Sequence, residues 1–583
     1  MQHAARQPDF TALKDVRADV PVGSPVETPS SNRDKSGISE QPEHPPTEPR
    51  DNDTPTDPGA AERTPGSDFT DWLPRHMIVA TLVLLPIWLA AFNGQWRIGS
   101  DTALYRVVAR SIVETGTYRH GMLPETHVFP GLPMSLAGVQ SIFGEADLPP
   151  VLLINLMAIG VLVLTYKLIR TNFEPWVAAC VTFGMALNGE LLLHTQEILT
   201  DVPFLLGVVA AWWGWERFQR PGQRVTGGVL LVLGLAFAAS MRPTFWVLAG
   251  AWLIVSTWKA IAGPNRLIHA SVVALVAIVG VSLIILDPRF TGFNVLNGGY
   301  EMRAVEAVGE LDGGILGNVM HVFGRQLPHG FFGEPMSPFG LIWAAPLLVG
   351  LVMVTRRVPL WGVTAWLLIG TTVVLSAAPR YYLMILPVLW LGWVLFAQQV
   401  WHWTDRWLRS PGGRKWERKL PPNFAGFAMC LVILLVPLTN AASIVNLIWE
   451  QRQPDFLNNY AEGKYLPMIE AAGVVAAHTD PDDIVIAPGP RVLSYFARRT
   501  VIGDPQFYGT GGDKQALAIF SDIEPDWCVF PASAYRETDR RLTRLLDNSQ
   551  RDAPIVATEP VQWLDLTVGE TEWYLARPVR REE

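Results

Sequence analysis

The stretch that decides the fold is residues 96–133, which read WRIGSDTALYRVVARSIVETGTYRHGMLPETHVFPGLP. It begins where the first long apolar run stops, and it is too polar to remain in lipid. Its first half has helical spacing, with apolar side chains on one face and charged ones on the other. The apolar face consists of Leu104, Val107, Val108 and Ile112, and the charged face of Arg106, Arg110 and Glu114. The pattern predicts an amphipathic helix that lies along a membrane surface.

The carboxylate of Asp101 lies in the first turn of this predicted helix. Ser100 or Asp101 is expected to cap the helix, and Gly116 is expected to end it. Acidic residues are favoured at helix starts because they face the positive end of the helix dipole. On this stretch alone, a role as a cap is the simpler interpretation of Asp101. The rest of the chain shifts that balance.

The composition is typical of a polytopic membrane protein. Only 17% of the 583 residues are charged, whereas soluble domains carry about 25%. The mean hydropathy is +0.21. The net charge of −8 does not indicate nucleic-acid binding, because most of the acid sits in the two chain ends. Three cysteines are too few for a disulfide framework, so no intrachain disulfide is expected, and no signal peptide is expected before the first apolar stretch near Met77.

About eleven apolar stretches are long enough to cross a bilayer of ~30 Å. They lie near residues 77–94, 148–168, 175–194, 200–217, 225–241, 243–260, 267–286, 338–355, 358–377, 380–400 and 423–448. The expected fold is therefore an all-α polytopic domain over residues 76–449, with outer loops at 95–147 and 287–337. Residues 1–75 are rich in Pro, Ser, Thr and acid, and are expected to form a disordered cytoplasmic tail.

The distribution of basic residues predicts the orientation of these spans. With the N-terminus in the cytoplasm, the inside loops carry Lys167, Arg170, Arg217, Arg220, Arg224, Lys259, Arg266, Arg356, Arg357 and the basic residues of 406–419. The short outside loops carry very little positive charge. The expected location is a bacterial inner membrane, with the tail after residue 449 outside the cytoplasm.

Residues 450–583 are expected to form a small extracytoplasmic α/β domain. Strand-like runs occur at 482–487, 526–530, 554–558 and 572–576, and helical segments at 492–498 and 540–547. Strands that alternate with helices indicate a compact α/β unit. Nothing in this segment has a catalytic pattern.

The polar elements between the spans all fall on the predicted outer side. Independent helix caps would have no reason to share one side. Among them is the segment HTQEILTD, residues 194–201, in which Thr200 is expected to cap the next helix. His194, Glu197 and Asp201 bring one imidazole and two carboxylates to the level of Asp101. Ionisable groups at this depth are costly unless they pair or have a function.

Two arginines lie at outer helix ends, against the positive-inside bias. Arg242 separates two spans, and Arg380 begins another. Each needs an anionic partner. A lipid phosphate is one candidate, because the guanidinium fork matches its geometry. A structural ion pair with Asp101, Glu197 or Asp201 is the alternative.

The predicted outer loop 287–337 is too long, at about fifty residues, to be a simple connector. It is a candidate lid or part of a substrate site. Arg325 is a candidate third phosphate ligand, and His321, with Tyr105 and His194, is a candidate substrate contact. The histidines and acids of the loop leave a divalent metal open, although no ligand spacing is diagnostic and no cofactor is required.

Several motifs resemble those of the GT-C glycosyltransferases, a superfamily that includes protein O-mannosyltransferases and bacterial lipid A aminoarabinose transferases. The motifs lie between about residues 77 and 400 and are SDTALYRVVARSIVETGTY, FPGLPMSLAGVQSIFG, EILTDVPFLL, SMRPTFW and APRYYLMILP. Each alone is weak, and their order and sidedness make the resemblance. The aminoarabinose transferases have an acidic-basic pair before the prolines, where this chain has His127, Val128 and Phe129. The metal or phosphate contact of that acidic-basic pair is therefore not assigned to residues 127–129 of this chain.

The resemblance implies an integral membrane enzyme that takes a sugar from a polyprenyl-phosphate carrier and passes it to an acceptor glycan, lipid or protein. Asp101 would be the general base, with Glu197 and Asp201 as further catalytic residues that orient it, an acceptor or a metal. Arg242, Arg380 and Arg325 would hold the donor phosphate. Attack from the face opposite the phosphate is expected to invert the anomeric centre.

Two other classes of function remain open from the sequence. A carrier or flippase for a lipid-linked or anionic substrate would use buried arginines and carboxylates but would need no base. Such carriers often show paired halves, and this sequence shows no convincing internal repeat. A non-catalytic assembly protein would leave the one-sided polar cluster unexplained.

Overall fold

A computed structural model describes most of the chain after residue 83. It covers residues 84–120, 123–124, 128–262, 266, 269–274, 314–333, 340–375, 379–410, 424–453, 465–487, 490–503, 526–531, 555–568 and 571–580. The predicted tail 1–75, most of the predicted span 267–286 and the predicted helix 540–547 lie outside these residues. So do Glu301, Arg303, Glu306 and Glu334 of the predicted lid.

The described part of the membrane domain is helical. Its elements are α4 (Leu148–Ile169), α5 (Pro175–Ala186), α6 (Gly189–His194), α7 (Asp201–Phe218), α8 (Arg224–Met241), α9 (Phe245–Ala262), α12 (Gly314–His321), η1 (Val322–Gln326), α13 (Leu327–Phe332), α14 (Gly340–Arg357), α15 (Pro359–Leu375), η2 (Pro379–Ile385), α16 (Leu386–Arg409) and α18 (Phe424–Arg452). Within the described residues, six helical segments are long and apolar enough to cross a membrane. They begin at residues 148, 224, 245, 340, 379 and 424.

One prediction for these segments is wrong in detail. The predicted span 175–194 is interrupted after Ala186, because Asn188 adopts an extended backbone conformation and its side chain accepts a hydrogen bond from Leu191 N at 2.9 Å, which starts α6. The described part of the predicted outer loop, residues 314–333, is a helical run, and whether it acts as a lid stays a prediction. Arg325 lies in its π-helical segment η1.

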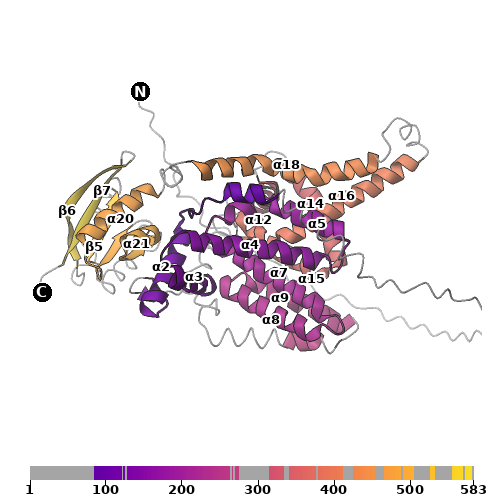
Figure 1. Ribbon diagram of the computed structural model, residues 1–583, viewed down its shortest axis with the longest axis horizontal. Helices are drawn as coiled ribbons and strands as arrows, with labels where there is room; N and C mark the ends of the chain where they lie inside the picture. Colours follow the sequence, from indigo (N-terminus) through magenta and orange to yellow (C-terminus); the bar gives the residue numbers. More distant parts are fainter. Residues whose placement is uncertain are drawn as a thin grey trace, which may run out of the picture. The chain divides into compact units, whose positions relative to one another are not determined.

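Helices α7 and α8 form a tightly packed hairpin, and Figure 1 shows them beside α9. Glycines allow the close approach. A Cβ atom on Gly214 would lie 2.4 Å from Leu231 N, and one on Gly234 would lie 2.5 Å from Ala211 N. Small residues at such contacts allow membrane helices to pack backbone against backbone. The hairpin brings the first residue of α7, Asp201, beside the residue after α8, Arg242.

The stretch 96–133 forms α2 (Ser100–Thr115), a short hairpin of β1 (Arg119–His120) and β2 (Leu123–Pro124), and α3 (Gly131–Phe143). Gly116 ends α2 in the left-handed conformation, as predicted, and its N–H donates to Ile112 O. The predicted N-cap is wrong. Gly99 occupies that position, and the Thr102 hydroxyl accepts the Gly99 N–H at 2.7 Å. The carboxylate of Asp101 is thus available for other partners.

Part of the charged face of α2 is covered by another element, while Glu114 remains exposed. The side chains of Arg106 and Arg110 are buried. Helix α21 packs against this face, and its Tyr495 ring lies 4.7 Å from the Arg106 guanidinium. A sequence pattern identifies a polar face but does not reveal that another polar element covers it.

The described C-terminal residues form a five-stranded sheet with two helices. The elements are α20 (Leu466–His478), β3 (Ile484–Ala487), α21 (Pro490–Ala497), β4 (Thr500–Gly503), β5 (Trp527–Pro531), β6 (Ile555–Val568) and β7 (Thr571–Arg580). The strand order is β4-β3-β5-β7-β6, with β3 parallel to β4 and β5, and β7 antiparallel to β5 and β6. Both helices lie beside the strands in Figure 1. Their core includes Val475, Val485, Leu493 and Val529.

The α7–α8 contact predicts a sharp difference between two glycine variants. Gly214→Ala should destabilise the protein by about 1–3 kcal/mol, because the new methyl group overlaps the backbone of α8. Gly228→Ala is the matched control, since its Cβ would meet only the Phe218 ring at 3.5 Å. Thermal melts in detergent measure both. A Gly214→Ala melting temperature equal to that of the wild type would contradict the packing argument.

Candidate functional site

Asp101 is the centre of the candidate site. Its side chain is 39% exposed, and each carboxylate oxygen has a different cationic partner. Oδ1 lies 2.5 Å from Nη1 of Arg491, which comes from α21. Oδ2 lies 3.5 Å from Nη2 of Arg380, which comes from η2. The structure therefore joins the start of α2 to two arginines that are far away in the sequence.

The second carboxylate of the site, Asp201, is buried and paired. Its Oδ1 accepts a hydrogen bond from Nη1 of Arg242, and both residues are almost fully enclosed. The Arg242 guanidinium also lies over the ring of Tyr381, 4.9 Å from its centroid. Arg380 interacts electrostatically with Asp201 as well as with Asp101. The two ion pairs thus form one connected group of charges.

Tyr105 lies between these two pairs. It follows Asp101 by one helical turn, and its phenol is influenced by Arg242, Thr200, Asp101 and Asp201. Burial raises the pKa of Tyr105 to about 12, against the opposing effect of the Arg242 guanidinium. The phenol is therefore neutral near pH 7 and can donate a hydrogen bond.

A cluster of imidazoles and carboxylates lies in the segment before α7. His194 Nδ1 is 2.5 Å from Glu197 Oε2, a close ion-pair contact that lacks the alignment of a hydrogen bond. His194 Nε2 is 3.7 Å from Glu190 Oε2. The other Glu190 oxygen contacts His329 Nε2 of α13 at 3.1 Å. Glu190 therefore links α6 to the helical run that contains Arg325.

Backbone hydrogen bonds fix the segment that carries these groups. Asn155 of α4 is buried and donates to Thr195 O at 2.8 Å. Arg97 N donates to Gln196 O at 3.1 Å, just before α2 begins. These bonds connect the segment before α7 with the segment before α2. The carboxylates of Asp101 and Asp201 are consequently held at the same end of the helices.

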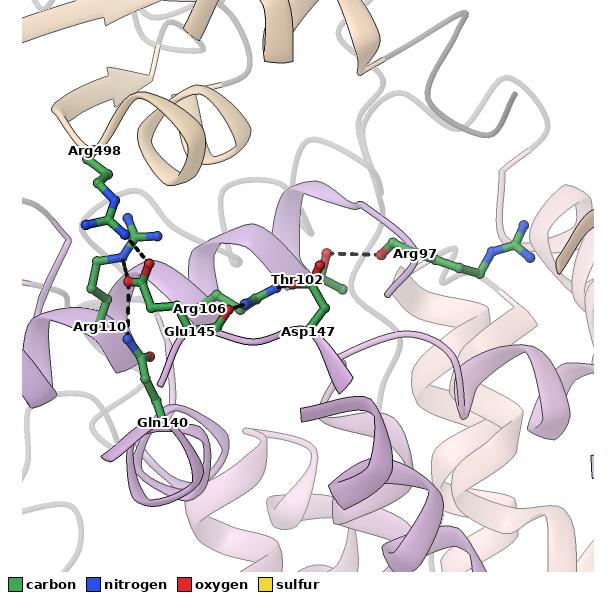
Figure 2. A network of polar contacts seen from close by, with 8 residues as sticks. All are labelled: Arg97, Thr102, Arg106, Arg110, Gln140, Glu145, Asp147 and Arg498. Atoms are coloured by element: carbon green, nitrogen blue, oxygen red, sulfur yellow. Dashed lines mark hydrogen bonds and ion pairs between the residues drawn. The ribbon is translucent and has the colours of Figure 1, made fainter. Parts of the chain in front are cut away.

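Helix α21 is attached to α2 and to the α3–α4 connection by a network of charges and rings, which we call the clasp. Its members are Trp96, Arg106, Arg110, Glu145, Asp147, Tyr495 and Arg498. Figure 2 shows Glu145 between Arg110 and Arg498, and Asp147 beside Arg106. The Tyr495 ring accepts cation–π contacts from both Arg106 and Arg110, at 4.7 and 4.8 Å.

The structure brings most of the candidate residues together. Asp101, Tyr105, His194, Glu197, Asp201, Arg242 and Arg380 all contact or electrostatically influence one another. His321 and Arg325 are exposed, and no described contact joins either to the other seven. Within the described part of the chain, no group of three or more His, Cys, Asp or Glu residues is arranged to hold a metal ion.

Sequence reasoning missed two members of the site, Glu190 and Arg491, and it considered His329 only as one of the loop histidines that could bind a metal. Arg491 carried a usable signal, because Arg491, Tyr495 and Arg498 lie at positions i, i+4 and i+7 and therefore on one helix face. A polar and aromatic stripe of this kind on a short helix indicates a contact surface. Glu190 carried a weaker signal, since it lies four residues before His194 and therefore on the same helix face.

The arrangement combines a partly exposed carboxylate with guanidiniums that are only partly neutralised. Arg380 is 33% exposed, and its Nε has no hydrogen-bond partner within the described residues. Such a group can bind an anion that approaches Asp101. Arg242 differs, because its pair with Asp201 is enclosed and its guanidinium packs on Tyr381.

No family model and no curated protein matches the chain, but solved structures do. ArnT from Cupriavidus metallidurans in the apo state is 14% identical, with a TM-score of 0.53, and the match covers 88% of this chain and 99% of that one. ArnT bound to undecaprenyl phosphate matches with a TM-score of 0.50 at 14% identity, over 87% of this chain and 98% of that one.

The archaeal oligosaccharyltransferase AglB from Archaeoglobus fulgidus, in complex with an inhibitory peptide and a dolichol-phosphate, is 13% identical, with a TM-score of 0.51. That match covers 82% of this chain and 71% of the other. At 13–14% identity these matches show the fold alone: the chain shares the fold of ArnT and of the archaeal oligosaccharyltransferase, as the resemblance implied. With its apolar helices, this fold makes the chain a multi-pass integral membrane protein.

Arg242 is buried and Arg380 is partly exposed, so their replacement should change the free energy of unfolding by different amounts. Arg242→Ala should cost about 3–5 kcal/mol, because it leaves Asp201 buried without a partner. Arg380→Ala should cost no more than about 1 kcal/mol, since its pair with Asp101 is partly exposed. Thermal melts of the purified variants in detergent compare the two.

An Arg242→Ala, Asp201→Ala double variant is the control for that comparison. It removes both charges, so it should be more stable than Arg242→Ala alone. Equal melting temperatures for Arg242→Ala and the wild type would show that the pair is not structural.

Proposed function

We propose that the chain transfers a glycosyl group from a polyprenyl-phosphate donor to an acceptor at the outer face of the membrane. The observation that carries this proposal is the partly exposed carboxylate of Asp101, held between Arg491 and Arg380 beside the buried pair of Asp201 and Arg242. A carboxylate and accessible cationic groups are what this reaction requires. The fold agrees, because one structural neighbour is bound to undecaprenyl phosphate and another to a dolichol-phosphate.

The proposed chemistry follows from the substrate. A sugar linked to a lipid phosphate already has a good leaving group, so the protein must position an acceptor and stabilise the departing phosphate. Asp101 takes the proton of the acceptor hydroxyl as the acceptor oxygen bonds to the anomeric carbon. The bond between that carbon and the phosphate oxygen breaks, and its electron pair stays with the phosphate. Attack from the opposite face inverts the anomeric centre.

The other residues are assigned roles by their positions. Arg380 binds the donor phosphate, because it is exposed and adjacent to Asp101. Arg242 reaches the phosphate only if it leaves Asp201, so its main role is to hold that carboxylate in place. Glu197 and Asp201 orient the polar segment around Asp101, and Tyr105 and His194 contact substrate from within it. His321 and Arg325 require a movement of the run 314–333 to take part.

We further propose the membrane arrangement that the sequence predicts. The N-terminus lies in the cytoplasm, about eleven spans follow, and the α/β segment after residue 449 lies outside the cytoplasm of a bacterial cell. The basic residues of the predicted inside loops support this orientation. It places Asp101 and Arg491 on the outer face, where the acceptor would be found.

Protease protection tests this arrangement. Protease added to intact spheroplasts should remove the segment after Trp449 and spare residues 1–75, because only the former is exposed on the outside. Immunoblots with tags at each end of the chain report the two cleavages. Removal of the N-terminal tag with retention of the C-terminal one would invert the topology and place Asp101 on the wrong face.

Replacement of Asp101 separates catalysis from structure. Asp101→Asn keeps the size of the side chain but cannot accept a proton as a base, so turnover should fall by at least about 10²-fold. The assay is transfer of a labelled sugar from polyprenyl phosphate by purified protein, with a thermal melt to confirm folding. Ser100→Ala is the matched control, since Ser100 lies in the same turn and does not cap the helix.

Retention of the wild-type transfer rate in Asp101→Asn would remove Asp101 as the base. Binding of the donor without any transfer by the wild-type protein would instead favour a carrier, which shares the arginines but needs no base.

A further inference from the structure

The C-terminal segment supplies a charged group to the site, although the sequence analysis found no catalytic pattern in that segment. Arg491 lies in the first turn of α21 and donates to Asp101 Oδ1 at 2.5 Å. Its side chain is 36% exposed, so solvent or a substrate reaches it. This ion pair joins residues that are 390 positions apart. Arg491 also lies outside the spans, where a guanidinium needs no buried partner for its own solvation.

The clasp fixes the position from which Arg491 reaches Asp101. Arg498 is the only described residue other than glycine with a positive φ, 54°. This left-handed conformation is costly for a side chain with a Cβ, by about 1–2 kcal/mol. It ends α21 and allows Arg498 to pair with Glu145. Strain of this kind persists where the surrounding contacts determine it.

Other contacts add to the rigidity of α21 against α2. Nη1 of Arg110 donates to Tyr495 O at 3.1 Å, and the Trp96 and Tyr495 rings pack edge to face with centroids 5.3 Å apart. Burial raises the pKa of Tyr495, so its ring stays neutral among the arginines. The helix is therefore held at several points along its length, and its first turn is directed to Asp101.

From this geometry we infer that Arg491, which the C-terminal segment supplies, is a ligand of the leaving phosphate. Before the reaction begins, Arg491 forms its ion pair with Asp101. The inference rests on the proposed transfer. In that step the proton moves from the acceptor hydroxyl to Asp101, whose charge changes from −1 to 0. The electron pair of the broken bond moves to the phosphate, which gains one negative charge. Charge thus leaves the carboxylate as it appears on the phosphate.

We expect Arg380 and Arg491 to exchange the carboxylate for the phosphate as their ion-pair partner. Before the step, Asp101 attracts both Arg380 and Arg491. After it, the neutral carboxylic acid attracts them less, and the phosphate attracts them more. Their transfer requires only side-chain rotation, because η2 and α21 are fixed by their own packing. The same two guanidiniums therefore stabilise the negative charge on Asp101 before the step and the negative charge on the phosphate after it.

Binding of undecaprenyl phosphate, the product form of such a donor, tests the inference without turnover. Arg491→Ala should weaken its binding in detergent about tenfold to a hundredfold, the value of one charged hydrogen bond. Arg380→Ala should have a similar effect. Asp101→Asn should bind at least as tightly as the wild type, because it releases both arginines. Undecaprenol, which lacks the phosphate, should show no difference among the variants.

Matched controls exclude general effects of charge and folding. Arg409→Ala removes an exposed arginine that pairs with Asp405 in its own helix, and it should bind like the wild type. Arg491→Gln keeps most of the side-chain volume and replaces Arg491→Ala if the latter melts early. It should show the same loss of binding.

The outcomes separate this inference from the proposed function. Wild-type binding by both Arg491 variants, with reduced sugar transfer, would limit Arg491 to positioning Asp101 and overturn the inference alone. Absence of phosphate-dependent binding by the wild-type protein would overturn the proposed donor and the inference together. Normal transfer by Asp101→Asn with weakened binding by Arg491→Ala would remove the base but keep Arg491 as a phosphate ligand.

Discussion

The ion pairs of Asp101 are the interaction on which the arrangement of the site depends. Membrane proteins carry few charges, and a carboxylate near the lipid boundary is costly unless cations compensate it. Asp101 draws its partners from η2 and α21, which flank the last described spans in the sequence. The Asp101 carboxylate at the start of α2 therefore contacts η2, which precedes α16, and α21, which belongs to the C-terminal segment. Loss of that charge would release two guanidiniums at once.

The opposite side of the site is rigid for a different reason. Glycines let α7 and α8 meet backbone to backbone, and the hairpin sets Asp201 against Arg242. Gly131 has a similar role, since a Cβ there would lie 2.8 Å from Ser240 O, one residue before the end of α8. The start of α3 is thus fixed beside the same hairpin end. The site therefore has two parts. The Asp201–Arg242 pair is buried and held by packed helices, whereas the ion pairs of Asp101 are partly exposed and their side chains can rotate.

Much of the fold was predictable because apolar length and periodicity determine membrane helices directly. Helices α4, α7, α8, α9, α14 and α18 begin within about two residues of the predicted stretches, and α16 begins about six residues later than predicted. The grouping of Asp101, Asp201 and Arg380 was predictable, because the basic-residue pattern assigns all three to the same predicted side of the membrane. The Gly99 cap, the break at Asn188 and the buried face of α2 were not. Each depends on a contact with another element, and periodicity contains no information about such contacts.

Exposure decides which of the two aspartates can act as a base. A general base must come within about 2.6–3.2 Å of the proton that it removes. Asp201 is 1% exposed, and one of its oxygens is bound by Arg242, so an acceptor could reach it only after the surrounding side chains moved. Asp101 needs no such movement, because over a third of its side chain is accessible. The resemblance assigned the proton to Asp101 and an orienting role to Asp201, and the difference in exposure favours the same division, because Asp201 is enclosed and Asp101 is accessible.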